Sequence, residues 1–426
     1  MERIIPQFLM PGLASRRRDI LHTVTASPFT SSVAFVCQPS AEWTAGETFY
    51  RHMFVAIRSV RAPGDMPEIV LFVPGDLDSS SSRSLEPLAD RLLVAPAEAV
   101  SRRMLSRRLK ALRRQLHWER PSSSTVGRLL QDNGIELVFT TSDFGSTFPI
   151  PVLAKIPDFQ HVRLPHMFSD DEIARRDILY ENLGRHAARI VVASEDIRRD
   201  FEDFARKWKD KVRVVPFAAS IEERLLSRDP IACSARYNLP EKFFFMPNQF
   251  WKHKNHLVVL DALAIASRKN DAMTVVFSGN TGDYRHPDYF SHLLQEICYK
   301  NVRRNVALLG LVPYDDVVQL MRRSIAVLQP SLFEGLSITL AEATSLGRPV
   351  VLSDIPVLRE LGPPTAHFFD PHDPEALARL LLELYDRLEP GPDQREELAA
   401  IERSADLVRT FGRVLLDITR EATTTV

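Results

Sequence analysis

The chain has 426 residues, of which 45% are hydrophobic and 26% charged, and its formal net charge is -1. This composition is ordinary for a soluble globular protein, and the length is too great for a single core, so two domains of about 200 residues each are expected. A net charge near zero excludes a global attraction to nucleic acid, so any basic binding surface must be local.

The three cysteines, Cys37, Cys233 and Cys298, lie far apart in the sequence and form no CxxC or Cys/His cluster. A reduced, cytoplasmic protein without structural zinc is the simplest inference. At the N-terminus a weak apolar stretch is broken by Pro6 and Pro11, and its basic cluster follows that stretch. This order suits neither a secretory signal nor a membrane span, so we expect the protein to work inside the cell.

Short apolar runs alternate with helical segments along most of the chain, which predicts an α/β fold of parallel strands buried on both faces. The segment at residues 142–172 is expected to be a long loop, and a final helix is expected at about residues 394–420. The predicted strands are residues 33–37, 69–73, 91–94, 134–140, 190–193, 212–216, 243–247, 274–279, 306–309, 325–328, 350–353 and 367–369.

Residues 101–120, SRRMLSRRLKALRRQLHWER, form the strongest local charge feature. Leu105, Leu109, Leu112 and Leu116 recur at helical spacing, and seven Lys and Arg residues between positions 102 and 114 occupy the other positions. This pattern predicts a basic amphipathic helix. Such a helix could lie on an anionic membrane surface or hold a polyanionic acceptor. Equally, it could be a surface helix whose leucines face the domain core, and both can hold at once.

Residues 325–354 read as a buried strand, a glycine-containing loop, a short helix and a second buried strand. Ser337 is a plausible N-cap for a helix over residues 338–346, and Gly347 followed by Pro349 is its stop signal. This unit points the N–H groups of a helix N-terminus at the carboxyl edge of the sheet, where open α/β folds favour a bound pyrophosphate.

Two carboxylates frame that helix, Glu334 in the preceding loop and Glu342 within it. Because helical side chains lean toward the N-terminus, the two groups could lie on either side of a bound diphosphate, one reaching a ribose and the other a sugar. Taken singly, each could instead be an ordinary carboxylate that complements the helix dipole. The neighbouring Gly335 and the flanking strands favour a nucleotide site.

The segment PSLFEGLSITLAEA resembles the E-x7-E region of retaining glycosyltransferases with the GT-B fold, glycosyltransferase family 4. The resemblance implies two Rossmann-like domains facing a cleft. It assigns residues 1–220 to an acceptor domain, residues 221–400 to a nucleotide-sugar donor domain, and residues 401–426 to a helix that returns to the N-terminal domain. It also implies transfer of a sugar from a nucleotide sugar to a glycan or lipid-linked glycan, in bacterial cell-surface polysaccharide biosynthesis.

The strand, basic loop and helix order of FFFMPNQFWKHKNH also suits phosphate binding. Family 4 enzymes usually place an Arg here and a Lys five residues later. Lys254 matches the lysine, but Gln249 stands at the arginine position, which leaves one cation fewer unless Lys252 or His253 compensates.

The segment IPDFQH resembles a signature of one branch of the family, in which the histidine faces the donor sugar across the cleft. By that match His161 is the candidate catalytic histidine, and Asp158 shapes its loop. Gly46 corresponds to the glycine loop after the first strand, although a plain helix start is an equal alternative. The resemblance also places backbone near Val312 against the nucleotide base.

These matches imply catalytic roles for His161, Lys254 and Glu334. Lys254 and the N–H groups of residues 335–338 would stabilise the departing diphosphate, whereas Glu334 would orient the sugar rather than act as a nucleophile. Since no DxD cluster occurs in the expected place, no obligatory metal or other cofactor is expected. The implied donor-binding residues are Gly46, Gln249, Lys254, Val312, Glu334, Gly335, Leu336, Ser337, Ile338 and Glu342.

Two other functions compete with this interpretation. A Rossmann dehydrogenase is disfavoured because the sequence has no GxGxxG or Walker lysine motif, which counts against the use of nicotinamide or ATP. A non-catalytic protein that binds nucleotide sugars or polysaccharide with the same fold stays open, because fold alone does not decide function. The basic segment at residues 101–120 adds the expectation of peripheral contact with the inner face of the membrane.

Overall fold

The computed structural model describes residues 32–37, 44–61, 67–73, 84–95 and 123–424. The basic segment at residues 101–120 and the N-terminal residues 1–31 lie outside these ranges. Among the helices that are described, none combines the length and the apolar character needed to cross a membrane.

The first domain is built on a parallel sheet of seven described strands in the order β3-β2-β1-β4-β5-β6-β7. The central strands β1, β4 and β5 are buried along their whole length, as expected when helices cover both faces of a sheet. The strands are β1 Ser32–Val36, β2 Glu68–Val73, β3 Arg91–Val94, β4 Leu137–Thr140, β5 Val152–Lys155, β6 Arg189–Val192 and β7 Val212–Val214.

The second domain contains a parallel sheet of six described strands in the order β10-β9-β8-β11-β12-β13. The strand order reverses between β8 and β11, and open α/β sheets bind ligands beyond the carboxyl ends of strands at such a point. The strands are β8 Phe244–Met246, β9 Val275–Phe277, β10 Val306–Leu308, β11 Ala326–Gln329, β12 Val350–Ser353 and β13 His367–Phe369.

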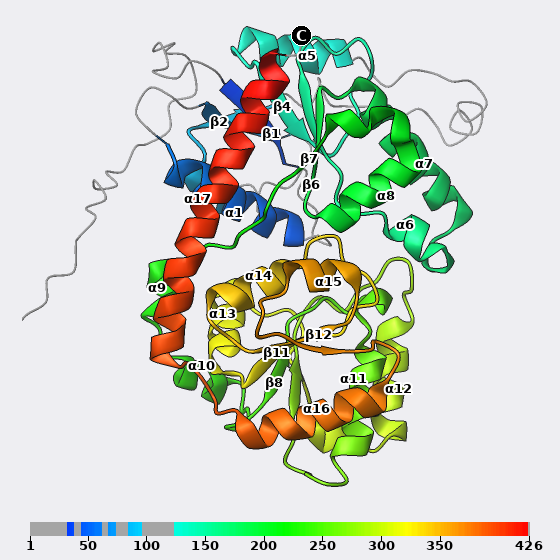
Figure 1. The fold of residues 1–426 in the computed structure, drawn as a ribbon, viewed down its shortest axis with the longest axis vertical. Coiled ribbons are helices and arrows are strands. Elements are labelled where there is room, and N and C mark those ends of the chain that lie inside the picture. The colour runs from blue at the N-terminus through cyan, green and yellow to red at the C-terminus, as the bar shows by residue number, and fades with distance from the viewer. Residues whose placement is uncertain (1–31, 38–43, 62–66, 74–83, 96–122, 425–426) are drawn as a thin grey trace, which may run out of the picture.

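Helices flank both sheets (Figure 1). In the first domain they are α1 Thr44–Ser59, η1 Glu86–Leu88, α5 Ser123–Asp132, α6 Gln160–Arg163, η2 Pro165–Met167, α7 Asp170–His186, α8 Glu195–Ala205 and η3 Arg206–Lys211. In the second they are α9 Glu223–Leu226, α10 Pro230–Arg236, η4 Lys252–Lys254, α11 His256–Ala266, α12 Tyr289–Tyr299, η5 Arg303–Asn305, α13 Tyr314–Arg323, α14 Ile338–Ser345, α15 Pro356–Leu361 and α16 Pro374–Arg387. The last helix, α17 Gln394–Thr424, contacts both domains.

All the strands predicted from the sequence are present, with small differences at their ends. The prediction of one long loop over residues 142–172 is wrong, because this stretch contains β5 and the short helix α6. β5 has only four residues, lies between Pro151 and Pro157, and ends in a lysine. A run this short and interrupted by a charge carries little periodic signal.

The long helix α17 joins the two domains (red in Figure 1). Toward its N-terminal end, Ser404 Oγ lies 2.9 Å from Ser345 Oγ of α14 in the second domain. Farther along, Phe411 is fully buried in the core that includes β1, β2 and α1 of the first domain. Near its end Glu421 pairs with Arg189 at 2.8 Å. The predicted return of the final helix to the N-terminal domain is therefore confirmed.

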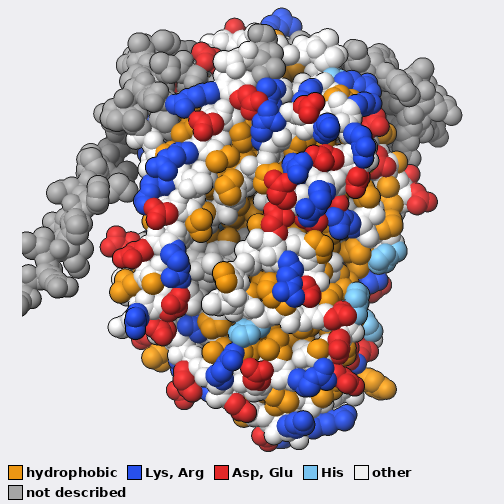
Figure 2. Space-filling model, in the orientation of Figure 1, with side chains coloured by type: hydrophobic (Ala, Val, Ile, Leu, Met, Phe, Trp, Pro, Cys, Tyr) orange, Lys and Arg blue, Asp and Glu red, His pale blue; other side chains and the backbone are white. Residues whose placement is uncertain are grey.

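Acidic and basic side chains are interspersed over the face of the molecule shown in Figure 2. Along α17, for example, Arg403 pairs with Glu396 at 2.6 Å, and Arg420 pairs with Asp417 at 3.4 Å. This mixed pattern agrees with the near-zero net charge of the whole chain.

Candidate functional site

A cavity of about 290 Å³ lies between the two domains. The first domain contributes residues of α1 and the segment that follows β5, and the second contributes the loops that follow β8 and β11. The second-domain part of the wall therefore lies beyond the carboxyl ends of two adjacent strands at the reversal of strand order. This is the position at which ligands bind in open α/β sheets.

The loop at residues 330–337, here called the α14 loop, lies between β11 and α14 at the cavity wall. Ser337 has a left-handed backbone conformation with φ 41°, and its side chain accepts a hydrogen bond from the N–H of Leu340 at 3.3 Å. The predicted N-cap is thus confirmed. Gly347 follows the end of α14 and has φ 65°, a conformation that glycine adopts without steric cost.

Gly335 touches the first domain directly. A Cβ atom on this residue would lie 2.3 Å from the carbonyl oxygen of Pro157 and 2.8 Å from Cβ of Asp158. Only glycine permits the α14 loop to approach the other domain this closely. The contact closes the cavity between the segment after β5 and the start of α14.

Glu334 and Lys254 form an ion pair in the cavity wall, with 2.6 Å between Lys254 Nζ and Glu334 Oε1. The same carboxylate oxygen accepts hydrogen bonds from Gln329 Nε2 at 2.5 Å and Ser331 Oγ at 2.6 Å. Asn248 in turn donates to Gln329 at 3.0 Å. These bonds fix the orientation of a side chain that is 7% exposed, and they join the loop after β8 to the loop after β11.

Glu342 connects the two domains through its Oε1 atom. It accepts a hydrogen bond from the Tyr314 hydroxyl at 2.8 Å and lies 3.2 Å from Nε2 of His52 on α1. His52 Nδ1 accepts the backbone N–H of Ser220 at 3.1 Å, so the ring proton belongs on Nε2 and is donated to Glu342. Burial and the neighbouring carboxylate hold the pKa of Tyr314 well above its ordinary value.

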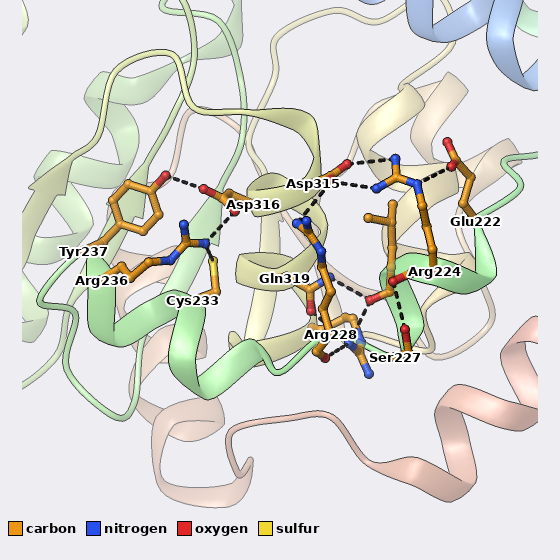
Figure 3. A network of polar contacts seen from close by, with 12 residues as sticks. Glu222, Arg224, Ser227, Arg228, Cys233, Arg236, Tyr237, Asp315, Asp316 and Gln319 are labelled. Carbon is orange, nitrogen blue, oxygen red and sulfur yellow. Dashed lines mark hydrogen bonds and ion pairs between the residues drawn. The ribbon is translucent and has the colours of Figure 1, made fainter. Parts of the chain in front are cut away.

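A polar network fixes helix α13, which begins at Tyr314 (Figure 3). Asp315 accepts hydrogen bonds from Arg224 at 2.7 and 3.1 Å. Asp316 accepts from Arg236 at 2.8 Å and from Tyr237 at 2.7 Å. Since α9 and α10 provide these partners, they hold the first turn of α13 in place, and with it the tyrosine that contacts Glu342.

Most of the predicted site residues meet at this cavity. Lys254 and Glu334 are both in its wall, and so are these predicted donor-binding residues: Gln249, Gly335, Leu336, Ser337, Ile338 and Glu342. Gly46 and Val312 are not brought to the wall. Gly46 is buried in the first turn of α1, and Val312 is buried in the loop after β10.

Of the two residues considered as replacements for the missing arginine, His253 lines the cavity. Burial, and then the charge of Lys254, hold the pKa of His253 well below its ordinary value, so this ring supplies no positive charge at neutral pH. Lys252 is outside the cavity wall, and its backbone N–H donates to Asp283 at 3.1 Å.

His161 lies in α6 and is not one of the residues that line the cavity. Its side chain is fully buried, its Nε2 atom lies 3.1 Å from Asp177 Oδ1, and its ring packs against Phe159 and Tyr180. Burial, and then the charge of Arg176, lower its pKa. The structure therefore does not bring His161 to the wall with Lys254 and Glu334, and its catalytic role stays a prediction.

Asp158 and Gln160 from the same motif do line the cavity. The Asp158 carboxylate accepts the N–H of Gln160 at 3.0 Å, which confirms that Asp158 shapes this loop. Sequence reasoning missed His52, Lys155 and Tyr314. Only Lys155 carried a visible signal, as a charge at the end of an otherwise apolar run.

Within the part of the chain that the structure describes, no three His, Cys, Asp or Glu side chains are grouped closely enough to hold a metal ion. The expectation that no obligatory metal is needed stays a prediction.

Comparisons with known proteins agree with this geometry. Residues 231–400 match the family model described as glycosyl transferases group 1. A solved structure of HepE from Anabaena, in complex with UDP and glucose, has a TM-score of 0.61 at 15% identity, covering 92% of this chain and 98% of that one. The apo structure of WaaB, a lipopolysaccharide outer core galactosyltransferase, has a TM-score of 0.57 at 16% identity, covering 91% and 99%.

The fold is therefore GT-B, two Rossmann-like domains that face a cleft. Over residues 231–400, within the second domain, the chain is similar to the glycosyl transferases group 1 family.

Among curated relatives, an uncharacterized glycosyltransferase of Methanocaldococcus jannaschii is 25% identical over 223 residues, which is 50% of this chain and 54% of that protein. The O-antigen chain mannosyltransferase of Salmonella typhimurium is 28% identical over 134 residues, 31% of this chain and 35% of that protein. The chain thus spans about half the length, or less, of the curated relatives it matches.

Proposed function

We propose that this protein is a retaining glycosyltransferase that moves a sugar from a nucleotide-sugar donor to a glycan or lipid-linked glycan, in bacterial cell-surface polysaccharide biosynthesis. The observation that carries the proposal is the ion pair between Lys254 and Glu334, which lies in one cavity with Glu342 and the start of α14. Similar proteins support it, since the HepE structures hold UDP and UDP-glucose and a relative is a mannosyltransferase of O-antigen chains.

The chemistry follows from where charge develops. Transfer from a nucleotide sugar leaves negative charge on the departing diphosphate. Lys254 and the backbone N–H groups near residues 335–338 would stabilise that charge from fixed positions. Glu334 would accept hydroxyl groups of the donor sugar and orient it, and Glu342 would accept hydroxyl groups of the ribose.

The first experiment measures thermal stabilisation of the purified protein by UDP, GDP, ADP and their sugars. A ligand at 100 times its dissociation constant stabilises the folded state by about 2.7 kcal/mol, which such a scan detects easily. The nucleotide sugar that stabilises the protein is then tested for release of free nucleoside diphosphate. The configuration of the transferred sugar, read by NMR, tests retention.

Two results would contradict the proposal. A protein that no nucleoside diphosphate stabilises has no donor site of the proposed kind. Stabilisation without any release of nucleoside diphosphate, even with a range of glycan acceptors, would favour a non-catalytic binding protein with the same fold.

Alanine replacements of the two glutamates are expected to have different effects. Glu342→Ala should weaken nucleoside diphosphate binding by about 10- to 100-fold, the effect of losing hydrogen bonds to a charged group. Glu334→Ala should mainly lower kcat with the donor sugar. Calorimetry on both variants, beside donor turnover, separates the two effects. Equal loss of nucleotide affinity in both variants would contradict these assignments.

We further propose that the basic segment at residues 101–120 brings the enzyme to anionic membrane, where a lipid-linked acceptor is found. This segment lies outside the described residues, and the proposal rests on its pattern of leucines and cations. Wild-type protein should sediment with anionic liposomes at 0.1 M salt and be released near 1 M, as the screening length falls from about 10 Å to about 3 Å.

Replacing Arg107, Arg108, Arg113 and Arg114 with Gln should abolish this sedimentation and leave donor hydrolysis intact. If the wild type stays in the supernatant even at low salt, the leucines belong to core packing and the membrane proposal is wrong.

A further inference from the structure

Lys155 is a buried cation in the wall of the cavity. It is the last residue of β5, and the whole residue is 7% exposed. Its Nζ atom lies 3.8 Å from the ring centroid of Phe49 on α1, and both residues line the cavity. The lysine therefore extends from the first domain toward the space that faces the α14 loop.

The surroundings of Lys155 disfavour its charged form. Burial lowers its pKa to about 8, although the charge of Asp158 acts in the opposite direction. The Phe49 ring face compensates part of the lost hydration by a cation–π contact. Strongly shifted groups in clefts mark functional sites more often than chance.

The backbone that follows Lys155 reaches the donor side of the cavity. Pro157 and Asp158, two and three residues farther on, make the close contact with Gly335 of the α14 loop. The end of β5 is thus held against the loop that carries Glu334. A side chain as long as lysine, starting two residues before this contact, is well placed to reach a group bound at the start of α14.

The charges of the cavity wall leave an anionic ligand poorly neutralised without Lys155. Among the described residues that line it, the cations are Lys155 and Lys254, and the carboxylates are Asp158, Glu334 and Glu342. Lys254 is already paired with Glu334 at 2.6 Å. A diphosphate that enters this site needs a further positive charge close by.

We propose that Lys155 binds the diphosphate of the nucleotide-sugar donor, so that the first domain supplies a cation to a ligand held mainly by the second. This inference rests on the proposed function and deepens it. Lys155 would supply the positive charge that the uncharged Gln249, on the opposite side of the cavity, does not supply. Because the contact crosses the domain boundary, donor binding would also favour the closed arrangement of the domains.

The test compares Lys155→Met with Lys211→Met. Lys211 is a partly buried lysine of the same domain that donates to the Ala187 carbonyl at 2.8 Å, and burial lowers its pKa too. It is outside the cavity wall. Calorimetry measures the affinity of the nucleoside diphosphate that stabilises the wild type, from UDP, GDP and ADP, and of the matching nucleoside.

Lys155→Met is expected to weaken diphosphate binding by about 10- to 100-fold and to leave nucleoside binding unchanged, while Lys211→Met changes neither. Unchanged diphosphate affinity in Lys155→Met would overturn the inference. Equal losses for diphosphate and nucleoside would also overturn it, because they indicate a distorted site. If the wild type binds no nucleoside diphosphate, the proposed function itself is wrong.

A measurement on the wild type covers the case in which Lys155→Met does not fold. With a pKa of about 8, about nine-tenths of Lys155 is protonated at pH 7 and about one-tenth at pH 9. Because only the protonated lysine attracts the diphosphate, the affinity for diphosphate should fall by about tenfold from pH 7 to pH 9. The pKa shifts of His253 and Tyr314 keep both uncharged over this range. The other charged groups of the cavity wall are Asp158, Lys254, Glu334 and Glu342.

Lys254→Met provides the control, because it removes the other lysine of the wall. It should bind more weakly at both pH values and retain the tenfold fall. A pH dependence that disappears in Lys254→Met would assign the titration to Lys254 and overturn the inference.

Discussion

Replacing Lys254 with alanine is expected to lower kcat for sugar transfer by about 100- to 1,000-fold, or about 2.7 to 4 kcal/mol of transition-state stabilisation. The ammonium group is fixed 2.6 Å from Glu334 in the cavity wall, so it can stabilise the departing diphosphate without rearrangement. The loss of stability should be smaller than the loss of rate. Glu334 keeps hydrogen bonds from Gln329 and Ser331, which satisfy the carboxylate when the lysine is gone.

Steady-state kinetics with the donor identified by thermal stabilisation give kcat, and thermal unfolding of the same samples gives the stability. Lys252→Ala is the matched control, because this neighbouring lysine lies outside the cavity wall. If Lys254→Ala transfers sugar at a near wild-type rate while Lys252→Ala is impaired, then Lys252 carries the diphosphate and the role assigned to Lys254 is wrong. A double-mutant cycle with Glu334→Ala would measure how far the two side chains act as a unit.

Much of the fold follows from local sequence signals. The unit from β11 through α14 to β12 has apolar strands, a serine N-cap at Ser337 and a glycine stop at Gly347, and each of these acts over a few residues. Such signals are readable because strand burial and helix capping depend on neighbours in the chain. β5 was missed because Pro151, Pro157 and Lys155 obscure a run of only four residues.

The site was only partly predictable, for a different reason. Lys254 and Glu334 were each identified from a motif, but they lie 80 positions apart in the sequence. They meet only because β8 and β11 are neighbours in the second sheet. The partnership of His52 with Glu342 spans 290 positions and two domains. No local pattern marks His52 as a site residue, because its role arises only when α1 faces α14.

His161 is a different case. The IPDFQH motif pointed to its side chain, yet the chain turns into α6 at this point and buries the ring against Phe159 and Tyr180. The same turn leaves Asp158 and Gln160 in the cavity wall. The motif thus marks a segment that reaches the cavity, while which of its side chains line the wall depends on the local helix.

The two domains also meet at several points around the cavity. Glu360 of α15 accepts hydrogen bonds from the backbone N–H groups of Glu195 and Asp196, at 2.6 and 3.0 Å, and so caps the first turn of α8. Arg285 donates to Gln160 at 3.1 Å across the same boundary. These contacts, with the Glu342–His52 bond, hold the domains in a closed arrangement in which Gly335 touches Pro157.

Gly335→Ala is therefore expected to reduce sugar transfer by about 100-fold, the effect of displacing a reacting group by about 1 Å. The added Cβ would lie 2.3 Å from the Pro157 carbonyl oxygen and 2.8 Å from Cβ of Asp158, so it would force the α14 loop and the first domain apart. Nucleoside diphosphate affinity should change much less than kcat, because most of its proposed contacts belong to the second domain.

Gly282→Ala is the matched control for Gly335→Ala. Its Cβ would meet only Asn280 Oδ1 at 3.5 Å, which is ordinary contact, although this loop also lies close to the cavity through the hydrogen bond from Trp251 to the Gly282 carbonyl. Transfer by Gly282→Ala should match the wild type. If Gly335→Ala also transfers sugar at the wild-type rate, the segment at Pro157 and Asp158 yields to the new side chain. The close approach of the two domains at this point would then not be required for catalysis.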